Sequence, residues 1–341
     1  MSRRFRTWLC VGAIAGLVLA SCGDDGGGDG GGATSPTTTV AETPKVGGTL
    51  SFGTYSETAG LDPIVSSGNG VTGYNEMAAV YDTLVRYNPQ TGAYENNFAT
   101  SVTSNADLTV WTVKLKDGVK FSDGTPYDAA AVKFGMDRHR SGTPSMTAAG
   151  ETCAQLYACP RNTTSSAAYM ALVSKIKVVD PLTVEFTLSQ PWSSFQYALS
   201  AEAAMIPSPT ALKAACTDPA APVTNCSFNL KPVGAGPFVV DKFEPKNTIA
   251  MSRNATYANG PAYLDKLVFV NSINDGGGSR TLDALKTGTI QAAFLRDPLP
   301  VKQAKDAGFT GFSTFEQAGG TLLVNVGVKV TCKAGEPAPT C

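Results

Sequence analysis

The sequence predicts an α/β protein built from more than one compact unit. The chain has 341 residues, more than a single core usually encloses. Alternating strand patterns separated by turns dominate its first two thirds, most clearly over 108–126. From residue 264 onward an apolar strand, a helix and a second strand follow one another. This βαβ order predicts a parallel sheet covered on both faces and a separate lobe.

The N-terminus has the features of a bacterial export signal. Three arginines precede an apolar run over 8–20 that is too short to span a bilayer stably. Leu19-Ala20-Ser21-Cys22 has the form of a lipobox, which predicts a signal peptide over 1–21 and a lipid on Cys22. An ordinary signal peptide that contains a cysteine is the alternative. Residues 22–45 are rich in Gly, Asp, Ser, Thr and Pro and are expected to be a disordered tether.

Charge and histidine content exclude several classes of function. The net charge is −1, and Lys and Arg are scattered, so we expect no nucleic-acid partner. His139 is the single histidine, so His-based metal cages cannot form and no metal or cofactor is expected. It lies between two arginines near the end of a predicted helix, where we expect a solvated or helix-terminal role.

The cysteines indicate an oxidising compartment. If Cys10 leaves with the signal and Cys22 carries lipid, six cysteines remain in close pairs. Local pairing is the simplest of the fifteen connectivities, and the others stay open. Thiolate metal sites are disfavoured because there is no Cys-x-x-Cys motif. The expected disulfides are Cys153–Cys159, Cys216–Cys226 and Cys332–Cys341.

The segment 108–126 carries the clearest structural signal. Trp111, Val113 and Leu115 alternate with polar residues, as in a strand with one buried face. Asp117-Gly118 and Asp123-Gly124 follow as tight turns. Asp128 is then positioned to cap a helix that begins at the next residue.

The other elements follow in order along the chain. Gly234-x-Gly236 is not a nucleotide motif, because Pro237 and a strand follow where a phosphate-binding helix would have to start. The expected elements are a strand over 46–55, a helix over 75–84, a hairpin over 176–188, a short helix after Pro191, a strand pair over 238–251, a strand over 267–273, a helix over 279–286, a strand over 290–295, a helix over 300–308, and strands over 309–315 and 321–326.

A set of short motifs recurs in a characteristic order through most of this chain. They are Gly47-Gly48-Thr49-Leu50, Leu61-Asp62-Pro63, Val80-Tyr81-Asp82-Thr83-Leu84-Val85, the segment 108–126 with Val132-Lys133-Phe134, Val233-Gly234-Ala235-Gly236-Pro237-Phe238, Arg253-Asn254 and Leu285-Lys286-Thr287-Gly288. In this order and spacing the chain resembles the extracytoplasmic solute-binding proteins of ABC importers, family 5, the peptide, dipeptide and nickel class.

The resemblance implies a periplasmic-binding-protein-like, two-lobed clamp of the class II type. It implies an N-terminal lobe over 46–264, with an extra subdomain inserted at about 75–175, and a second lobe over 265–341. Members of the family usually continue further, so we expect this second lobe to be incomplete. The implied function is capture of a small solute, an oligopeptide or dipeptide, and its delivery to an ABC permease by a lipid-anchored monomer on the extracytoplasmic face of the cell membrane.

Candidate ligand residues are those in loops that leave the ends of strands, where such clefts form. The structural alternative is that Tyr55 belongs to the core, that Glu57 and Arg296 are solvated, and that the glycines only form turns. The candidates are Tyr55, Ser56 and Glu57 after the first strand, Asn69, the group Phe294, Leu295 and Arg296, and the stretch from Gln317 to Gly320.

Two other functions stay open. A receptor lipoprotein that binds ligand without transport needs the same clamp. A secreted hydrolase is disfavoured, because the chain lacks a Gly-x-Ser-x-Gly elbow and His139 has no nucleophile in a supporting context. We therefore expect a binding protein and not an enzyme.

Overall fold

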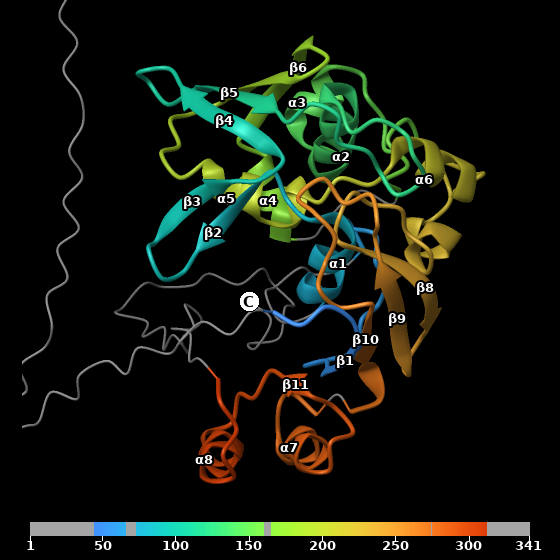
Figure 1. Cartoon of the computed structure of the whole chain (residues 1–341). Coiled ribbons are helices and arrows are strands. Elements are labelled where there is room, and N and C mark those ends of the chain that lie inside the picture. Colours follow the sequence, from blue (N-terminus) through green and yellow to red (C-terminus); the bar gives the residue numbers. More distant parts are fainter. Residues whose placement is uncertain (1–43, 66–72, 160–164, 274, 312–341) are drawn as a thin grey trace, which may run out of the picture. The chain divides into compact units, whose positions relative to one another are not determined.

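The largest sheet joins the N-terminal strand to strands from the far end of the chain. A computed structural model describes residues 44–65, 73–159, 165–273 and 275–311 (Figure 1). Its five-stranded sheet has the order β11-β1-β10-β9-β8. Strand β1 is parallel to both of its neighbours, whereas β8, β9 and β10 pair antiparallel. The strands are β1 Thr49–Gly53, β8 Phe238–Glu244, β9 Thr248–Arg253, β10 Lys266–Val270 and β11 Ala292–Ala293.

The predicted βαβ unit is present, but it does not start a separate sheet. Helix α7 (Ser279–Lys286) connects β10 to β11, and α8 (Pro298–Asp306) follows. Both strands flank β1, and Leu267 and Phe269 of β10 enter the same core as β8 and β9. The boundary expected near residue 265 therefore falls inside one continuous sheet, because β1 needs these later strands as its pairing partners.

A second, antiparallel sheet has the order β4-β5-β7-β6. The buried side chains of Trp111, Val113 and Leu115 confirm the alternation predicted for β5. Asp128 accepts a hydrogen bond from the Ala131 amide at 2.9 Å and caps α2, which packs against β6 and β7. The elements are β4 Ala99–Ser104, β5 Val110–Leu115, α2 Ala129–Arg140, β6 Val173–Asp180 and β7 Thr183–Leu188.

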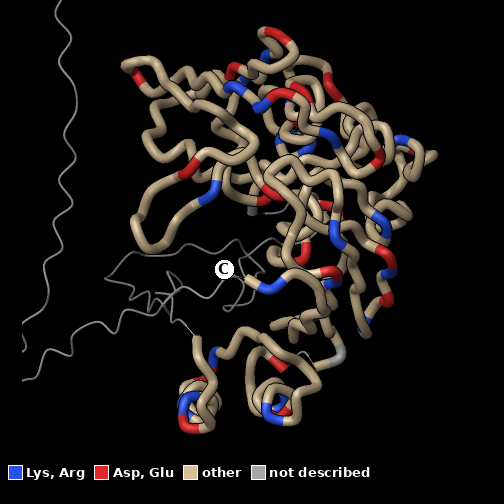
Figure 2. Tube along the Cα trace, in the orientation of Figure 1, with Lys and Arg blue, Asp and Glu red and all other residues tan. Residues whose placement is uncertain are grey.

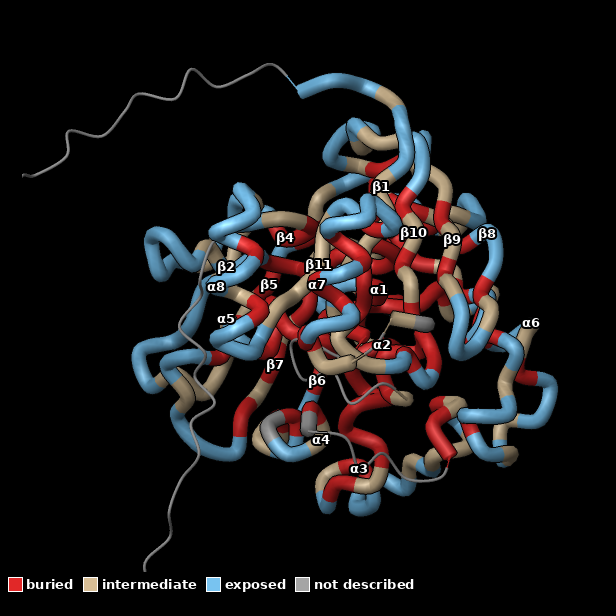
Figure 3. Tube along the Cα trace, turned by 90° about the horizontal axis from the view of Figure 1, so that it is seen from below, coloured by how far each residue is buried: buried red, intermediate tan, exposed pale blue. Residues whose placement is uncertain are grey.

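The subdomain expected over 75–175 differs from this unit at both ends. Helix α1 (Tyr74–Tyr81) buries Met77, Val80 and Tyr81 in the core of the five-stranded sheet. Strand β7 lies beyond residue 175 and pairs with both β5 and β6. A small hairpin of β2 (Val85–Asn88) and β3 (Ala93–Asn96) follows α1. Figure 3 shows the buried residues gathered in the central strands, α1 and α2, and the exposed residues in the connections.

The Gly-x-Gly motif permits close contact between a loop and α1. A Cβ atom added to Gly234 would lie 2.2 Å from the Val80 carbonyl oxygen, and one added to Gly236 would lie 2.6 Å from the Val80 carbonyl carbon. The Gly236 amide donates to that same oxygen at 2.8 Å. These glycines therefore serve backbone packing, in agreement with the exclusion of a nucleotide site.

Short helices and two disulfides complete the described fold. Cys153–Cys159 and Cys216–Cys226 are disulfides in the structure, as the local pairing predicts. Cys22 and the pair Cys332 and Cys341 lie outside the described residues. Within the described part of the chain, no helix combines the length and apolar character required to cross a membrane. The short helices are α3 Pro144–Ala148, α4 Ser165–Met170, α5 Gln196–Ser200 and α6 Pro209–Ala215, with 3-10 turns at Glu202–Ala204, Val223–Asn225, Ser227–Asn229 and Asn271–Ile273.

His139 lies in the last turn of α2, which agrees with the helix-terminal role expected for it, but its side chain is buried and not solvated. His139 is only 1% exposed, and its Nδ1 lies 2.7 Å from the Ser166 hydroxyl. Burial and the neighbouring Arg138 lower its pKa to about 3, so the imidazole is neutral. The charged run that suggested solvation is itself buried, because Arg138 pairs with Asp62 and Arg140 pairs with Asp137.

Candidate functional site

Loops from distant parts of the chain meet at the carboxyl edge of the five-stranded sheet. Because β1 and β11 are parallel, the residues that follow them lie at the same edge, where α/β proteins usually bind ligands. Nη1 of Arg296 donates to the Tyr55 hydroxyl at 2.6 Å. The rings of Tyr55 and Phe294 pack edge to face with centroids 5.6 Å apart. The structure therefore brings together three of the predicted ligand residues.

The turn at Gly276 and Gly277 holds the backbone on both sides of this arrangement through hydrogen bonds. The Gly276 amide donates to the Tyr55 carbonyl oxygen at 3.0 Å, and the Arg296 amide donates to the Gly277 carbonyl oxygen at 3.2 Å. Gly277 has a φ of 75°, and a Cβ there would lie 2.6 Å from the Phe294 carbonyl oxygen. The turn thus requires glycine both for its backbone conformation and for space.

The start of α7 fixes the same turn. The Asp275 carboxylate accepts from the amides of Gly278 at 3.0 Å and Arg280 at 2.7 Å, and from the Thr281 hydroxyl at 2.5 Å. Burial alone would raise the pKa of Asp275, but these hydrogen bonds outweigh burial and lower it. Asp275 therefore remains ionised and holds the turn against the helix.

Behind the Tyr55 loop lies a group of four buried polar side chains, which we call the polar cluster. Thr54 and Thr58 follow β1, Glu76 lies in the first turn of α1, and Asn271 follows β10. All four are buried, and hydrogen bonds connect them: Thr58 Oγ1 with Glu76 Oε1 at 2.7 Å, and Thr54 Oγ1 with Asn271 Oδ1 at 2.9 Å. The cluster ties the ends of β1 and β10 to α1.

The remaining predicted ligand residues have different positions. Ser56 and Leu295 are half-buried, and Glu57 is exposed. Asn69 and the stretch from Gln317 to Gly320 lie outside the described residues. The sequence interpretation missed the polar cluster and the supporting turn at Gly276 and Gly277. The Asp-Gly-Gly-Gly run at 275–278, a few residues after β10, was the available signal for the turn.

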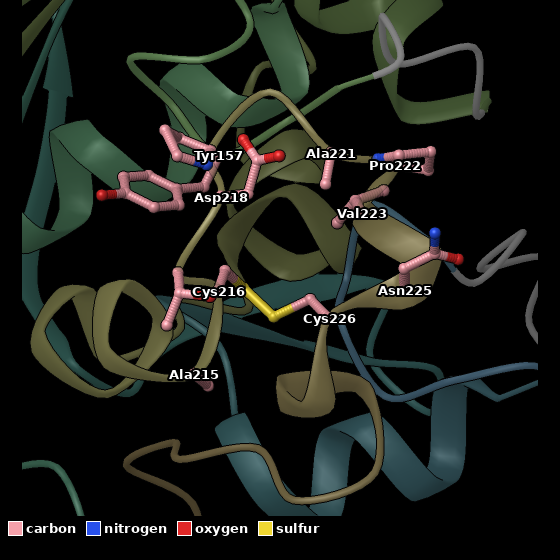
Figure 4. Close-up of a pocket in the computed structure, with 11 residues that line it drawn as sticks. Tyr157, Ala215, Cys216, Asp218, Ala221, Pro222, Val223, Asn225 and Cys226 are labelled. Carbon is pink, nitrogen blue, oxygen red and sulfur yellow. A yellow bond between two sulfur atoms is a disulfide. The ribbon is translucent and has the colours of Figure 1, made fainter.

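A shallow cavity elsewhere does not compete with this site. It surrounds the Cys216–Cys226 disulfide and is also lined by Tyr157, Asp218 and Val223 (Figure 4). Its volume is about 110 Å³, below the roughly 300–1,000 Å³ of typical ligand pockets. None of its lining residues comes from the loops at the carboxyl edge of the sheet.

The charged residues of the described structure do not indicate a second functional site. Figure 2 shows Lys and Arg interspersed with Asp and Glu along the described chain. Among the residues that the structure describes, no group of three or more His, Cys, Asp or Glu side chains could hold a metal ion.

The family model, a curated relative and a solved structure that match this chain are all of binding proteins. Residues 93–329 match the family model "Bacterial extracellular solute-binding proteins, family 5 Middle". The glutathione-binding protein GsiB of Shigella flexneri is 30% identical over 211 residues, which are 62% of this chain and 35% of GsiB. The chain thus spans about a third of the length of this curated relative.

Solved structures show the same fold. The periplasmic binding protein DppA from Helicobacter pylori, in complex with the peptide STSA, has a TM-score of 0.63 and 26% identity, and the match covers 79% of this chain and 50% of DppA. NikZ from Campylobacter jejuni, in complex with Ni(L-His), has a TM-score of 0.58 at 21% identity and covers 76% of this chain and 45% of NikZ. At that identity NikZ supports the fold alone.

These matches confirm the fold class predicted from the sequence, the α/β fold of the periplasmic binding proteins. The family model covers more than half of the chain and includes the four-stranded sheet, β8 to β11 and the Arg296 loop. The chain belongs to the bacterial extracellular solute-binding proteins, family 5.

Proposed function

We propose that this protein captures a peptide-like solute outside the cytoplasm and delivers it to an ABC permease. The observation that carries the proposal is the meeting of Tyr55, Phe294 and Arg296 at the carboxyl edge of β1 and β11. Two of the compared relatives, named for glutathione and for a bound peptide, support this ligand class.

The chemistry of the three residues suits such a ligand. A guanidinium binds a carboxylate through two parallel hydrogen bonds, and the bond from Arg296 to the Tyr55 hydroxyl orients that group. The rings of Tyr55 and Phe294 offer an apolar surface beside it. We therefore assign the ligand carboxylate to Arg296 and an adjacent side chain of the ligand to the two rings.

Delivery requires two conformations. In a clamp, ligand stabilises the closed arrangement of the lobes over an open one that differs by a few kcal/mol. The permease would then accept the closed form. We place the protein at the extracytoplasmic face of the membrane as a lipid-anchored monomer, with Cys22 as the lipid site and 22–45 as the tether.

Ligand capture is tested with the purified protein and two probes, glutathione and the peptide STSA. Binding of either probe should raise the unfolding free energy by about 2.7 kcal/mol at a hundredfold excess over Kd. Arg296→Ala and Tyr55→Phe should weaken binding, the former at least tenfold. Lys242→Ala is the matched control, since Lys242 is exposed on β8 and pairs only at the surface with Glu244.

Native mass spectrometry of the protein as purified provides a second test. A co-purified peptide would support the proposal. A metal complex as the sole bound species, together with no response to either probe, would contradict the peptide assignment.

The anchor and the transport role need separate experiments. Cys22→Ser should release the protein from membranes into the soluble fraction. Deletion of the gene should reduce uptake of the bound peptide. Normal uptake in the deletion strain would favour a receptor that binds ligand without transport.

A further inference from the structure

The hydroxyl of Thr58 lies between two oxygen atoms in the polar cluster. It is 2.7 Å from Glu76 Oε1 and 3.3 Å from Asn271 Oδ1. A hydroxyl has a single proton and can therefore donate to only one of them. If Glu76 is ionised, its carboxylate accepts the hydrogen bond from the Thr58 hydroxyl. If Glu76 is protonated, its carboxyl group donates a hydrogen bond to Thr58 Oγ1, and the Thr58 hydroxyl is then free to donate to Asn271 Oδ1.

The surroundings of Glu76 favour the neutral acid. Glu76 is 2% exposed, and burial raises its pKa, although hydrogen bonds from Thr58 and the backbone oppose the shift. No ion pair among the described residues includes Glu76. The charged groups around α1 affect the pKa values of its tyrosines instead. In addition to burial, Asp62 and Arg138 affect the pKa of Tyr81, and Glu202 and Asp82 raise the pKa of Tyr74.

The side chain of Asn271 provides an independent observation. Asn271 is fully buried, and its amide nitrogen has no hydrogen-bond partner. A half-turn of the amide would direct this nitrogen at the two threonine hydroxyls. Thr58 could then donate to an ionised Glu76, and Thr54 to the Val270 carbonyl oxygen, 3.4 Å away. The cluster thus has two hydrogen-bonded arrangements, one for each charge state of Glu76.

Both loops of the ligand site are attached to this cluster. Thr54 and Thr58 bracket Tyr55, while Asn271 precedes the turn whose Gly276 amide donates to the Tyr55 carbonyl oxygen. A change in the hydrogen bonds of the threonines therefore acts on the backbone that positions Tyr55.

We propose that Glu76 is a positioning residue for the Tyr55 loop, and that its ionisation, which places a charge without an ion-pair partner in the buried polar cluster, loosens this loop and weakens ligand binding as the pH rises. The part concerning ligand rests on the proposed function. The part concerning the loop does not, because it can be measured on the protein without ligand.

Hydrogen exchange of the full chain tests the loop directly. After correction for intrinsic rates, protection of the amides over 54–58 should fall at least tenfold between pH 5 and pH 8 in the wild type. Glu76→Gln should keep the high protection at both pH values, because its amide donates to Thr58 as the protonated acid does. Glu244→Gln changes a half-buried acid at the end of β8, outside the polar cluster, and should behave as the wild type. Equal pH dependence in Glu76→Gln and the wild type would overturn the proposal.

Thr58→Val keeps the test decisive if Glu76→Gln does not fold. It removes the hydroxyl that links Glu76 to the loop, so loop protection should become independent of pH while stability still depends on the charge of Glu76. If Thr58→Val retained the wild-type pH response of the loop, the link would be excluded.

The effect on ligand binding is tested by measuring the affinity for glutathione and for STSA at pH 5 and pH 8. Affinity of the wild type should fall at least tenfold at pH 8, and that of Glu76→Gln should not change. Failure of both probes at both pH values would contradict the proposed function and leave the exchange result standing. Exchange that does not depend on pH would contradict the role of Glu76 and leave ligand binding standing.

Discussion

Arg138 and Asp62 form a two-pronged ion pair in the interior of the protein, with Nη1 to Oδ1 at 2.7 Å and Nη2 to Oδ2 at 2.6 Å. Their side chains are 1% and 0% exposed. Arg138 also donates from Nε to the Leu156 carbonyl oxygen and from Nη2 to the Tyr157 carbonyl oxygen. The pair thus joins α2, the loop after β1 and the first disulfide loop.

Removal of one partner of this pair should be costly. Arg138→Met or Asp62→Asn leaves a buried charge without its partner, which typically costs about 3–5 kcal/mol. Urea denaturation followed by tryptophan fluorescence measures the loss. The double variant Arg138→Met with Asp62→Asn should lose much less than the sum of the two single variants. Strict additivity would show that the two side chains do not stabilise each other.

The two disulfide loops should stabilise each other as well. The Val223 amide, inside the second loop, donates to the Cys159 carbonyl oxygen of the first, and Leu156, Ala158 and Val223 share a small core. Replacement of both cysteines of a pair by serine should cost about 2–3 kcal/mol for loops of this length. Removal of both pairs should cost less than the sum, because either change already weakens the shared contacts. Denaturation of the four variants measures this coupling.

His139 should reduce stability at low pH. Its pKa is lowered to about 3 in the folded protein, against about 6.5 when unfolded. Between these values only the unfolded state binds the proton, so the unfolding free energy should fall as the pH drops below 6.5, by up to about 1.4 kcal/mol per pH unit.

His139→Asn should remove this acid dependence while retaining a polar group near Ser166. Since the chain has one histidine, the imidazole resonances of an untagged sample report its pKa without assignment. They should not change between pH 5 and pH 8, and a midpoint near 6.5 would contradict the burial of this side chain. The contribution of Glu76 to stability has the opposite pH dependence. Its pKa is raised in the folded protein, so its contribution is lost as the pH rises.

The contact between α1 and the Gly-x-Gly loop should not tolerate a methyl group. Gly234→Ala and Gly236→Ala would place Cβ atoms against the Val80 backbone, and overpacking of this kind costs about 1–3 kcal/mol. Gly311→Ala is the control, since nothing lies within 4 Å of its Cβ position. Thermal unfolding should separate the first two variants from the third.

Local signals in the sequence predicted local structure well. Alternation over 108–126 located β5, and Asp128 marked the start of α2, because a strand face and a helix cap depend on neighbouring residues. The position of Asp123 in a turn was also correct. Its second contact, from the Ser208 hydroxyl at 2.6 Å, joins residues 85 positions apart and has no local signature.

Long-range features were the ones that could not be predicted. The position of β10 beside β1 depends on a pairing between distant segments, so the change of pattern near 264 suggested a new lobe. His139 was expected to be solvated or helix-terminal, and the burial of the whole run from Asp137 to Arg140 was not predicted. Its burial depends on Asp62, which lies far away in the sequence. For the candidate site, strand ends led to Tyr55, Phe294 and Arg296, whose role in ligand binding stays a prediction, while the polar cluster behind them gave no comparable signal.

The central place of β1 has a consequence for the order of folding. Hydrogen bonds from Gly48 to Asp265 and from Ser51 to Gln291 span 217 and 240 residues. Contacts between such distant segments form slowly, because a long loop must close before they contribute. Strand β1 comes first among the described strands and is therefore expected to be among the last to complete its pairing. Because Tyr55 follows β1 and Arg296 follows β11, their contact can form only after that closure.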